Sequence, residues 1–489
     1  MDRRTVPAFP ALLLGAALVA GPIAGCARNP VTGKNEISLV SEGQEIEMGR
    51  QATQEVAQSI GFVDDPELQA YVAGIGKRMA AKSERPNLPW EFHVVNDAAV
   101  NAFALPGGFI YVTRGLLAYM NSEAELATVL GHEIGHVTAR HSVQQISKAQ
   151  LATLGLGVGS ILSSDIAQFA GLASQGLGVL FLKYGRDAEN QADQLGFKYA
   201  LGSNYDVREM GNVFQTLNRA SQVGGGGGRL PEWLSTHPNP ENRVARTQQR
   251  LDTLQAPLGN TVVGRDEYLQ QIQGITFGED PRQGFFEGST FYHPDMRFQL
   301  EFPDGWKTQN TPSAVVAVSP KEDAMIQLGL AGNTPPREAA SKFLAQEGVR
   351  AGDASTRSIN GNQAATSYFQ AQTQQGVVEG IVSFISYGGR TFALMGYTPQ
   401  GNLGNYDGEF RGAINSFDRL QNSAALEVKP AKVELVKLSR EMTLTQFNQE
   451  YPSTIPIEQL AIINELEGPE SVIPRGRVVK RVVGGRARG

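Results

Sequence analysis

The spacing of apolar and polar residues divides the chain into a helical first half and a strand-rich second half. Apolar residues recur at helical intervals from about residue 41 to about residue 255. Beyond residue 257 the pattern changes to short runs in which apolar and polar residues alternate, as they do in strands. The clearest alternating runs are residues 298–302, 364–371 and 391–397. We therefore expect an α+β protein with more than one structural unit.

Helix start signals give the order of elements in the first half. The first expected helix begins near Ser41. Further helices are expected over residues 66–82, 122–147, two segments between 184 and 219, and 239–254. Ser122 is followed three residues later by Glu125, a capping box that marks the start of a long helix. Residues 90–95 alternate as a strand, and residues 101–112 are typical of two strands joined through a Pro-Gly-Gly turn. The first half is thus predicted to be mainly helical with a small sheet.

The second half is expected to contain two smaller units. Residues 336–349 form one amphipathic helix among short strands, which predicts a small α+β domain. Nearer the C-terminus the pattern is helix, turn, helix and basic strand. The expected boundaries are a tether over residues 26–40, a first domain over 41–256, a linker over 257–284, the α+β domain over 285–420, a second linker to residue 432, a module over 433–484 and a basic tail over 485–489.

Composition and charge exclude several classes of protein. A chain of 489 residues is too long for one compact domain, and 41% hydrophobic with 19% charged residues excludes a wholly disordered chain. The 55 glycines follow no triplet period, which excludes collagen. The formal net charge of −6 disfavours a nucleic-acid partner, because binding phosphates requires a basic surface.

The start of the chain is organised like a bacterial export signal. Two arginines near the N-terminus precede a short apolar run over residues 12–20, and Ile23-Ala24-Gly25-Cys26 follows. These last four residues resemble a lipobox, which implies removal of residues 1–25, lipidation of the Cys26 thiol and a lipid-anchored protein. Ala27 in the next position favours the outer membrane, facing the periplasm. The alternative is an ordinary secretory signal with an incidental cysteine.

One predicted helix carries a metal-binding pattern. His132 and His136 are four residues apart, so both imidazoles lie on one helix face and can bind one cation. Glu133, one position on, leans toward a water bound to that cation. A catalytic zinc site needs a third protein ligand, and Glu189 on a later helix is our candidate. Two nitrogens and one oxygen suit one Zn2+ ion per chain in a hydrolase.

Residues around this pattern have candidate supporting roles. Asp193, one turn after Glu189, would accept the free ring N–H of one histidine and hold its metal-binding tautomer. The alternative for this acidic pair is a solvent-exposed helix surface. His237 stands in a proline-rich turn that would fix its direction ahead of the helix bearing Arg243. Three roles fit His237: donor to the oxyanion of the tetrahedral intermediate, fourth metal ligand in a resting state, or packing residue.

Four blocks of sequence, taken in order, resemble a known enzyme family. The blocks are Asn-Ala-Phe-Ala-Leu-Pro-Gly-Gly at residues 101–108, His-Glu-Ile-Gly-His-Val-Thr-Ala-Arg-His at 132–141, Tyr-Gly-Arg-Asp-Ala-Glu-Asn-Gln-Ala-Asp at 184–193 and Ser-Thr-His-Pro-Asn-Pro-Glu-Asn-Arg at 235–243. They are similar to metallopeptidase family forty-eight, which contains the HtpX-like and CAAX prenyl endopeptidases. The resemblance covers about residues 41–255.

The resemblance implies a gluzincin fold whose zinc is held by the three ligands named above. We place Asp193 and Arg243 behind these ligands. The residues expected to form an edge strand that pairs with an extended substrate are Asn101, Ala102, Phe103 and Ala104. Members of the family with several transmembrane helices are integral proteases. Residues 151–181 of this chain lack a clean apolar run of spanning length, and we expect a lid or a buried hairpin there.

Two weaker resemblances concern the second half of the chain. Residues 292–306 are similar to the opening of a PsbP-like domain, and residues 443–483 are similar to a degenerate LysM module. The second resemblance makes peptidoglycan a candidate partner beside protein or peptide substrates and the membrane.

Together these features predict a zinc endopeptidase, anchored by lipid to the bacterial envelope, that hydrolyses misfolded or unassembled envelope proteins. Glu133 is expected to act as general base toward a metal-activated water. The alternative is a mainly non-catalytic envelope chaperone or cell-wall tether that uses the C-terminal domains. All expected catalytic positions are filled, which favours the enzyme.

Overall fold

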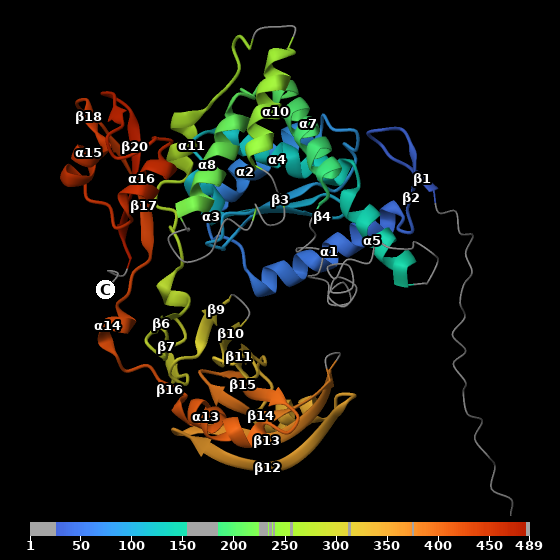
Figure 1. Ribbon diagram of the computed structural model, residues 1–489, viewed down its shortest axis with the longest axis vertical. Coiled ribbons are helices and arrows are strands. Elements are labelled where there is room, and N and C mark those ends of the chain that lie inside the picture. Colours follow the sequence, from blue (N-terminus) through green and yellow to red (C-terminus); the bar gives the residue numbers. More distant parts are fainter. Residues whose placement is uncertain are drawn as a thin grey trace, which may run out of the picture.

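The computed structural model has a helical domain, a sheet domain and a C-terminal module (Figure 1). It describes residues 26–153, 184–223, 233, 237, 240–254, 258–311, 314–373 and 376–485. The expected signal peptide over 1–25, most of the apolar segment over 151–181, the glycine run at 224–228 and the end of the basic tail lie outside the described residues. Among the described residues, no helix combines the length and apolar character required to cross a membrane.

The helical domain consists of helices around a three-stranded sheet. Its helices are α1 (Glu42–Ser59), α2 (Pro66–Ala80), α3 (Arg114–Tyr119), α4 (Glu123–Thr138), α5 (His141–Thr153), α7 (Arg186–Gly202), α8 (Glu209–Val223), α10 (Pro240–Asp252) and α11 (Arg265–Gln271). Its strands are β3 (Glu91–Val95), β4 (Ala102–Leu105) and β5 (Phe109–Thr113). β5 pairs in parallel with β3 and antiparallel with β4, so β4 is an edge strand. The turn between β4 and β5 passes through Gly107 and Gly108, both with positive φ.

The capping box at Ser122 and Glu125 is formed as expected, but the helix it starts is shorter than the sequence suggests. α4 ends at Thr138, and α5 begins at His141. Between them Arg140 has a φ of 59°, in the left-handed region, which breaks the helix.

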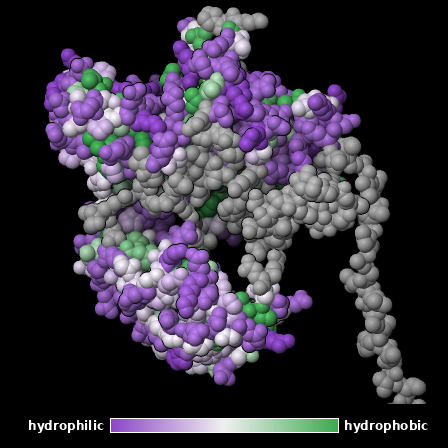
Figure 2. Space-filling model, viewed as in Figure 1, coloured by the Kyte–Doolittle hydropathy of each residue, from purple (hydrophilic) through white to green (hydrophobic). Residues whose placement is uncertain are grey.

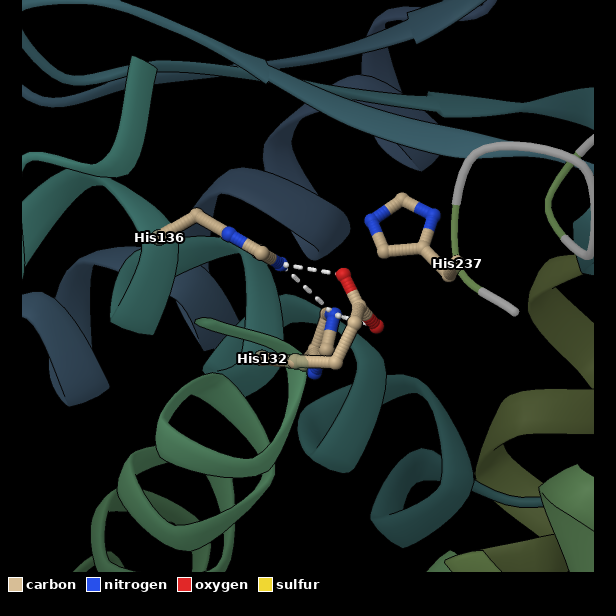
Figure 3. A group of neighbouring side chains, drawn as sticks. His132, His136 and His237 are labelled. Atoms are coloured by element: carbon tan, nitrogen blue, oxygen red, sulfur yellow. Dashed lines mark hydrogen bonds and ion pairs between the residues drawn. The ribbon is translucent and has the colours of Figure 1, made fainter. Parts of the chain in front are cut away.

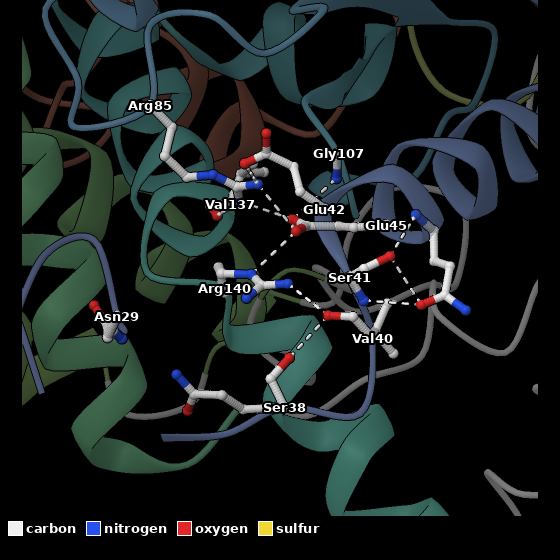
Figure 4. A network of polar contacts seen from close by, with 12 residues as sticks. Asn29, Ser38, Val40, Ser41, Glu42, Glu45, Arg85, Gly107, Val137 and Arg140 are labelled. Atoms are coloured by element: carbon white, nitrogen blue, oxygen red, sulfur yellow. Dashed lines mark hydrogen bonds and ion pairs between the residues drawn. The ribbon is translucent and has the colours of Figure 1, made fainter. Parts of the chain in front are cut away.

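A buried ionic network holds the C-terminal end of α4 (Figure 4). Arg85 donates to the carbonyl of Val137 at 3.0 Å and to Glu45 Oε1 at 2.8 Å. Arg140 donates to Glu45 Oε2 at 3.1 Å, and the backbone N–H of Gly107 donates to Glu45 Oε1 at 3.3 Å. Glu45 of α1 therefore connects the end of α4 to the turn beside the edge strand.

The expected tether over residues 26–40 is part of the folded structure. β1 (Cys26–Arg28) and β2 (Asn35–Ile37) form an antiparallel hairpin. Asn29 is buried and donates from its side-chain amide to the carbonyl of Ala139 at 3.2 Å. The described part of this segment thus packs against the junction of α4 and α5.

The expected linker over residues 257–284 also belongs largely to the helical domain. It contains α11, whose Tyr268 is fully buried and donates to the carbonyl of Leu117 at 2.7 Å. Leu269 and Ile272 pack in the same core. Sequence pattern alone did not reveal this segment because a single short helix leaves little periodic signal.

The sheet domain is built on a seven-stranded antiparallel sheet with the order β12-β13-β14-β15-β11-β10-β9. Its strands are β9 (Lys307–Asn310), β10 (Ala314–Val318), β11 (Met325–Leu330), β12 (Val349–Ile359), β13 (Asn362–Thr373), β14 (Gly376–Tyr387) and β15 (Arg390–Pro399). A four-stranded sheet lies beside it, formed by β6 (Phe285–Glu287), β7 (Thr290–His293), β8 (Phe298–Glu301) and β16 (Asp418–Arg419), after the short 3-10 helix η2 (Pro281–Gln283).

Two helices cover opposite faces of the large sheet. α12 (Pro336–Leu344) packs against Val382 and Phe384 of β14, whereas α13 (Leu403–Ser416) packs with Ile381 and Ile385 of the same strand. Alternate residues of a strand point to opposite faces, so both faces of β14 are buried. The small α+β domain predicted from sequence consists mainly of β-strands, with α12 and α13 as its covering helices.

The C-terminal module packs directly on the helical domain. Its elements are α14 (Ser423–Leu426), β17 (Ala431–Lys437), β18 (Met442–Thr443), α15 (Leu444–Glu450), α16 (Ile457–Ile463), β19 (Val472–Ile473) and β20 (Val478–Gly484), and β17 pairs antiparallel with β20. Gln459 donates to the hydroxyl of Tyr119 at 2.7 Å. The buried Lys480 ammonium donates to the carbonyls of Ala118 at 2.9 Å and Met120 at 2.7 Å. The two units share one hydrophobic core.

The face of the molecule drawn in Figure 2 is mainly hydrophilic where its residues are described.

Candidate metal centre

The candidate site depends on a close contact between α4 and α7. Gly131 and Gly135 of α4 face Gly196 and Ala192 of α7. A Cβ atom added at Gly196 would lie 2.8 Å from the backbone nitrogen of His132, a distance that side chains do not tolerate. Glycine at this contact therefore allows the two helices to approach closely enough for α7 to present Glu189 to α4.

Four buried side chains meet at this contact (Figure 3). One nitrogen or carboxylate oxygen each of His132, His136, Glu189 and His237 lies within 4.8 Å of the others. Glu189 Oε2 lies 3.7 Å from His132 Nε2, and Glu189 Oε1 lies 3.4 Å from His136 Nε2. Three of these residues come from α4 and α7, and His237 comes from the chain preceding α10.

The hydrogen bond from His132 to Asp193 fixes the tautomer of this histidine. His132 Nδ1 lies 3.0 Å from Asp193 Oδ1. Arg243 Nη2 lies 3.2 Å from the same nitrogen, but it already donates to Asp193 Oδ1 at the shorter distance of 2.5 Å. With Asp193 as the acceptor, Nδ1 carries the proton and Nε2 presents a lone pair to the cluster. Burial lowers the pKa of His132 well below its usual value, which keeps the imidazole neutral.

A second chain of hydrogen bonds orients His136 in the same way. His141 Nε2 lies 2.9 Å from Gln191 Oε1, and His141 Nδ1 lies 2.9 Å from His136 Nδ1. If the amide oxygen of Gln191 accepts, His141 Nδ1 is an acceptor and His136 Nδ1 must donate to it. His136 Nε2 then also presents a lone pair to the cluster. Burial lowers the pKa of both His136 and His141 to about 3.

With these tautomers, the Nε2 atoms of both histidines are hydrogen-bond acceptors, and no proton lies between them and the carboxylate of Glu189. His132 Nε2 and His136 Nε2 are 3.0 Å apart, and neither oxygen of Glu189 has a hydrogen-bond partner. Buried acceptors facing one another are unfavourable unless a cation joins them. Neutral imidazoles with a carboxylate are the ligands that zinc prefers, so the donor set fits a zinc ion.

Arg243 of α10 lies behind the cluster and contacts the carboxylates of both Asp193 and Glu189. Its guanidinium donates to Asp193 Oδ2 at 2.9 Å and to Asp193 Oδ1 at 2.5 Å, and its Nη1 lies 3.4 Å from Glu189 Oε2. The same group stacks over the rings of Phe214 and Trp233, at 4.2 and 4.3 Å from their centroids. Arg243 thus offsets the charge of Asp193, which in turn orients His132.

Glu133 is buried next to the cluster. Its Oε1 lies 3.7 Å from His237 Nε2. Burial, together with the negative charge of Glu189, raises the pKa of Glu133 to about 8. A carboxyl group with a pKa near neutrality is suited to accept and return a proton.

His237 faces the cluster with one ring nitrogen. Its Nδ1 lies 3.2 Å from the backbone carbonyl of Trp233, and its ring stacks on the indole at 4.8 Å between centroids. A carbonyl only accepts, so Nδ1 carries the proton and Nε2 presents a lone pair. Burial lowers the pKa of His237 well below its usual value, which disfavours a second proton.

The residues expected to bind substrate lie on and next to the edge strand β4. Asn101 precedes the strand, and Ala102 and Ala104 are buried within it. Phe103 stacks on Tyr111 of β5, at 4.8 Å between ring centroids. Among the described strands β4 pairs with β5 alone, so one side of its backbone lies outside this sheet ladder.

Two aromatic residues next to the site were not predicted as site residues. Tyr184 stacks on His136 at 3.9 Å between ring centroids, and its hydroxyl lies 2.8 Å from Ser142 Oγ. Trp233 packs against both His237 and Arg243. Tyr184 opens the block of sequence that contains Glu189, and Trp233 stands four residues before His237, so proximity to those residues is the signal that could have found them.

Comparison with known proteins relates this region to a protease family. The sequence model described as "Peptidase family M48" matches residues 66–251, which contain all four residues of the cluster. The metallopeptidase predicted from sequence is confirmed at the level of this family match.

Two curated relatives are named as proteases. The chain is 33% identical over 266 residues to the beta-barrel assembly-enhancing protease of Yersinia pestis, covering 50% of this chain and 53% of that protein. It is 36% identical over 184 residues to the mitochondrial metalloendopeptidase OMA1 of Arabidopsis thaliana, covering 37% of this chain and 36% of that protein. The chain thus spans about half or less of the length of these relatives.

A solved structure is similar to part of the chain. Cyanobacterial PsbP from Synechocystis shares 14% sequence identity with a TM-score of 0.23, covering 27% of this chain and 94% of that chain.

We predict that Gly196→Ala weakens zinc binding by ~10 to 100-fold, because the added methyl group pushes α7 and its Glu189 away from α4. The control is Gly202→Ala in the last turn of the same helix, where an added Cβ has no heavy atom within 4 Å. That substitution should leave zinc affinity unchanged. Zinc affinity is measured by competition with a chromogenic chelator. Equal zinc affinity in the Gly196 variant and the wild type would contradict the proposed role of the close helix contact.

Proposed function

We propose that this chain, whose residues 66–251 match peptidase family M48, is a zinc-dependent endopeptidase. The observation that carries the proposal is the pair of buried imidazoles with fixed tautomers, His132 and His136, whose lone pairs meet beside Glu189. Glu133 adjoins the same cluster without being part of it. A metal-binding triad with a separate buried carboxyl group is the arrangement that hydrolysis by an activated water requires.

In the mechanism, His132, His136 and Glu189 would hold the metal ion. The chemistry that zinc would supply there is acidification of a water molecule and polarisation of the peptide carbonyl. Glu133 takes the proton released when the water attacks the carbonyl carbon and returns it to the departing amine nitrogen. Asp193 and Arg243 keep His132 in the tautomer that binds metal throughout this cycle.

The edge strand β4 suggests how a substrate is held. An extended peptide can add to the free side of β4 through backbone hydrogen bonds. Such binding reads backbone more than side chains and requires an unfolded segment. We therefore propose that substrates are misfolded or unassembled proteins; the Yersinia relative is a beta-barrel assembly-enhancing protease.

The cell envelope is the proposed location of this activity. The sequence Ile23-Ala24-Gly25-Cys26 supports lipidation at Cys26, and Ala27 supports retention at the outer membrane. The folded hairpin that begins at Cys26 supports a short connection between the lipid and the helical domain. The enzyme would then act at the periplasmic face of the membrane.

For His237, the geometry supports the role of fourth metal ligand in a resting state. Its Nε2 lone pair, fixed by the contact of Nδ1 with the Trp233 carbonyl, faces the cluster. A neutral imidazole in this tautomer cannot donate to an oxyanion from Nε2. In this state His237 would compete with the attacking water for the metal ion, so activity would require His237 to move away.

We predict that Glu133→Gln retains zinc but loses peptide hydrolysis by ~10²-fold or more, because an amide cannot take up the proton. Zinc content is measured by metal analysis, and hydrolysis is measured with casein. Glu67→Gln, an exposed residue of α2, provides the same change in charge away from the site and should remain active. Turnover near the wild-type rate in the Glu133 variant would rule out this mechanism.

We predict that His237→Ala raises the rate of casein cleavage while one zinc ion per chain is retained, because the other three ligands remain. His93→Ala serves as the control, since His93 stacks on Phe62 and Tyr111 away from the cluster. A lower kcat in the His237 variant would instead assign this residue to the oxyanion. An unchanged rate and zinc affinity would assign it to packing.

We predict that Cys26→Ser releases the protein from the membrane fraction, because the thiol that carries the lipid is lost. Ala27→Asp is the matched variant: it keeps the thiol and should remain membrane-bound but shift from the outer to the inner membrane. Cell fractionation followed by a salt wash measures both outcomes. Persistence of the Cys26 variant in washed membranes would disprove anchoring through this residue.

A further inference from the structure

Three carboxylates from distant parts of the chain meet where the C-terminal module contacts the helical domain. Glu125 lies in the first turn of α4, Glu209 is the first residue of α8, and Glu465 follows α16 of the C-terminal module. One oxygen atom of each lies within 4.8 Å of the other two. This acidic cluster is separate from the metal centre and has no part in the proposed mechanism.

Two of these carboxylates contain buried oxygens without a hydrogen-bond donor. Glu125 is 1% exposed, and its Oε2 accepts from the backbone N–H groups of Asn121 and Ser122, whereas no N–H donor among the described residues reaches its Oε1. Glu465 accepts from Arg265 at its Oε2, at 3.0 Å, and within the described part of the chain its buried Oε1 meets no N–H donor either. Buried carboxylate oxygens left in this way are costly unless a cation or a proton neutralises them.

The surrounding basic groups supply only part of that neutralisation. Among the described residues, Arg265 is the one basic residue that forms an ion pair with the acidic cluster. Lys480 is nearby, but its ammonium donates to the carbonyls of Ala118 and Met120. Burial, the charge of Glu465 and a side-chain hydrogen bond with Glu465 raise the pKa of Glu125 well above its usual value, so this carboxyl group takes up a proton unless a cation replaces it. With all three carboxyl groups ionised, one ion-paired arginine would leave an excess of negative charge.

We propose that Glu125, Glu209 and Glu465 bind a hard divalent cation of the calcium type. Ligands composed only of oxygen are those that such cations prefer over zinc. Because the three oxygen atoms lie within 4.8 Å of one another, all of them can reach one ion with bonds of ~2.4 Å, the usual length for calcium. Glu209 and Glu465 are partly exposed, so water can complete the coordination.

The site would join three elements that the chain connects only through long segments. It links the N-terminal turns of α4 and α8 to the end of α16 in the C-terminal module. α4 carries His132 and His136 further along, so the cation would fix the module against the beginning of the metal-binding helix. This role is structural, and it is independent of whether the chain hydrolyses peptides.

The test uses the full mature chain with its zinc site already filled. Calcium binding is measured by isothermal titration calorimetry and by luminescence of Tb3+, which substitutes for calcium. We expect one saturable site per chain and a higher unfolding temperature in calcium. Glu465→Gln should abolish both effects, whereas Glu467→Gln, an exposed neighbour with the same change in charge, should leave them intact.

A second variant keeps the test decisive if Glu465→Gln does not fold. Glu209 is partly exposed and accepts from Asn212 alone among the hydrogen bonds observed, so Glu209→Gln should fold and should also lose calcium binding. Absence of saturable binding in the wild type would overturn the proposal and assign the acidic cluster to a shared proton. Binding that persists unchanged in both variants would overturn it equally, because the ion would then lie elsewhere.

Discussion

The close contact between α4 and α7 is the constraint on which the candidate metal centre depends. A helix pair separated by ordinary side chains would hold Glu189 too far from the two histidines to share one ion with them. Gly135 and Gly196 remove the side chains at the crossing, and the backbones come together there. The identity of the ligands and the spacing of the helices are therefore two parts of one requirement: glycine at the crossing is as necessary to the site as histidine.

Charged groups are costly to bury this deeply, and hydrogen bonds from the surrounding residues determine which ring nitrogens of the histidines carry protons. Asp193 is hydrogen-bonded to His132, and Gln191 is connected to His136 through His141. Each of these chains of hydrogen bonds leaves an unprotonated Nε2 facing the cluster. Arg243 offsets the carboxylate of Asp193. The helix bearing the histidines is held at both ends: Glu125 caps its start, and the network around Glu45 holds its end. Candidate ligands held in this way lose less conformational entropy if a metal ion binds.

How much of this could be predicted from sequence follows from the range of each interaction. His132, His136 and Glu133 lie within one helical turn, so the spacing of the sequence alone places them on one helix. Glu189 and Asp193 could be proposed for the same reason on a second helix. The break at Arg140 could not, because it is made by contacts with Glu45 and Val40 from a distant segment. Likewise α11 and the hairpin at Cys26 are folded by packing against helices far along the chain, and the meeting of Glu125 with Glu465 leaves no local signal.

The orientation of His237 connects these observations to regulation. Its Nδ1 contacts the Trp233 carbonyl and its ring stacks on the Trp233 ring, which also lies over Arg243. If His237 moves out of the cluster while Trp233 stays, the ring stack and the hydrogen bond between them break. If both residues move, Arg243 loses an aromatic partner. Arg243 orients Asp193 and, through it, His132. Either movement costs energy, and the second removes a contact of Arg243, the residue that orients Asp193. A partner or substrate that contacts the segment around Trp233 could therefore change metal binding and access of water together, without touching a metal ligand.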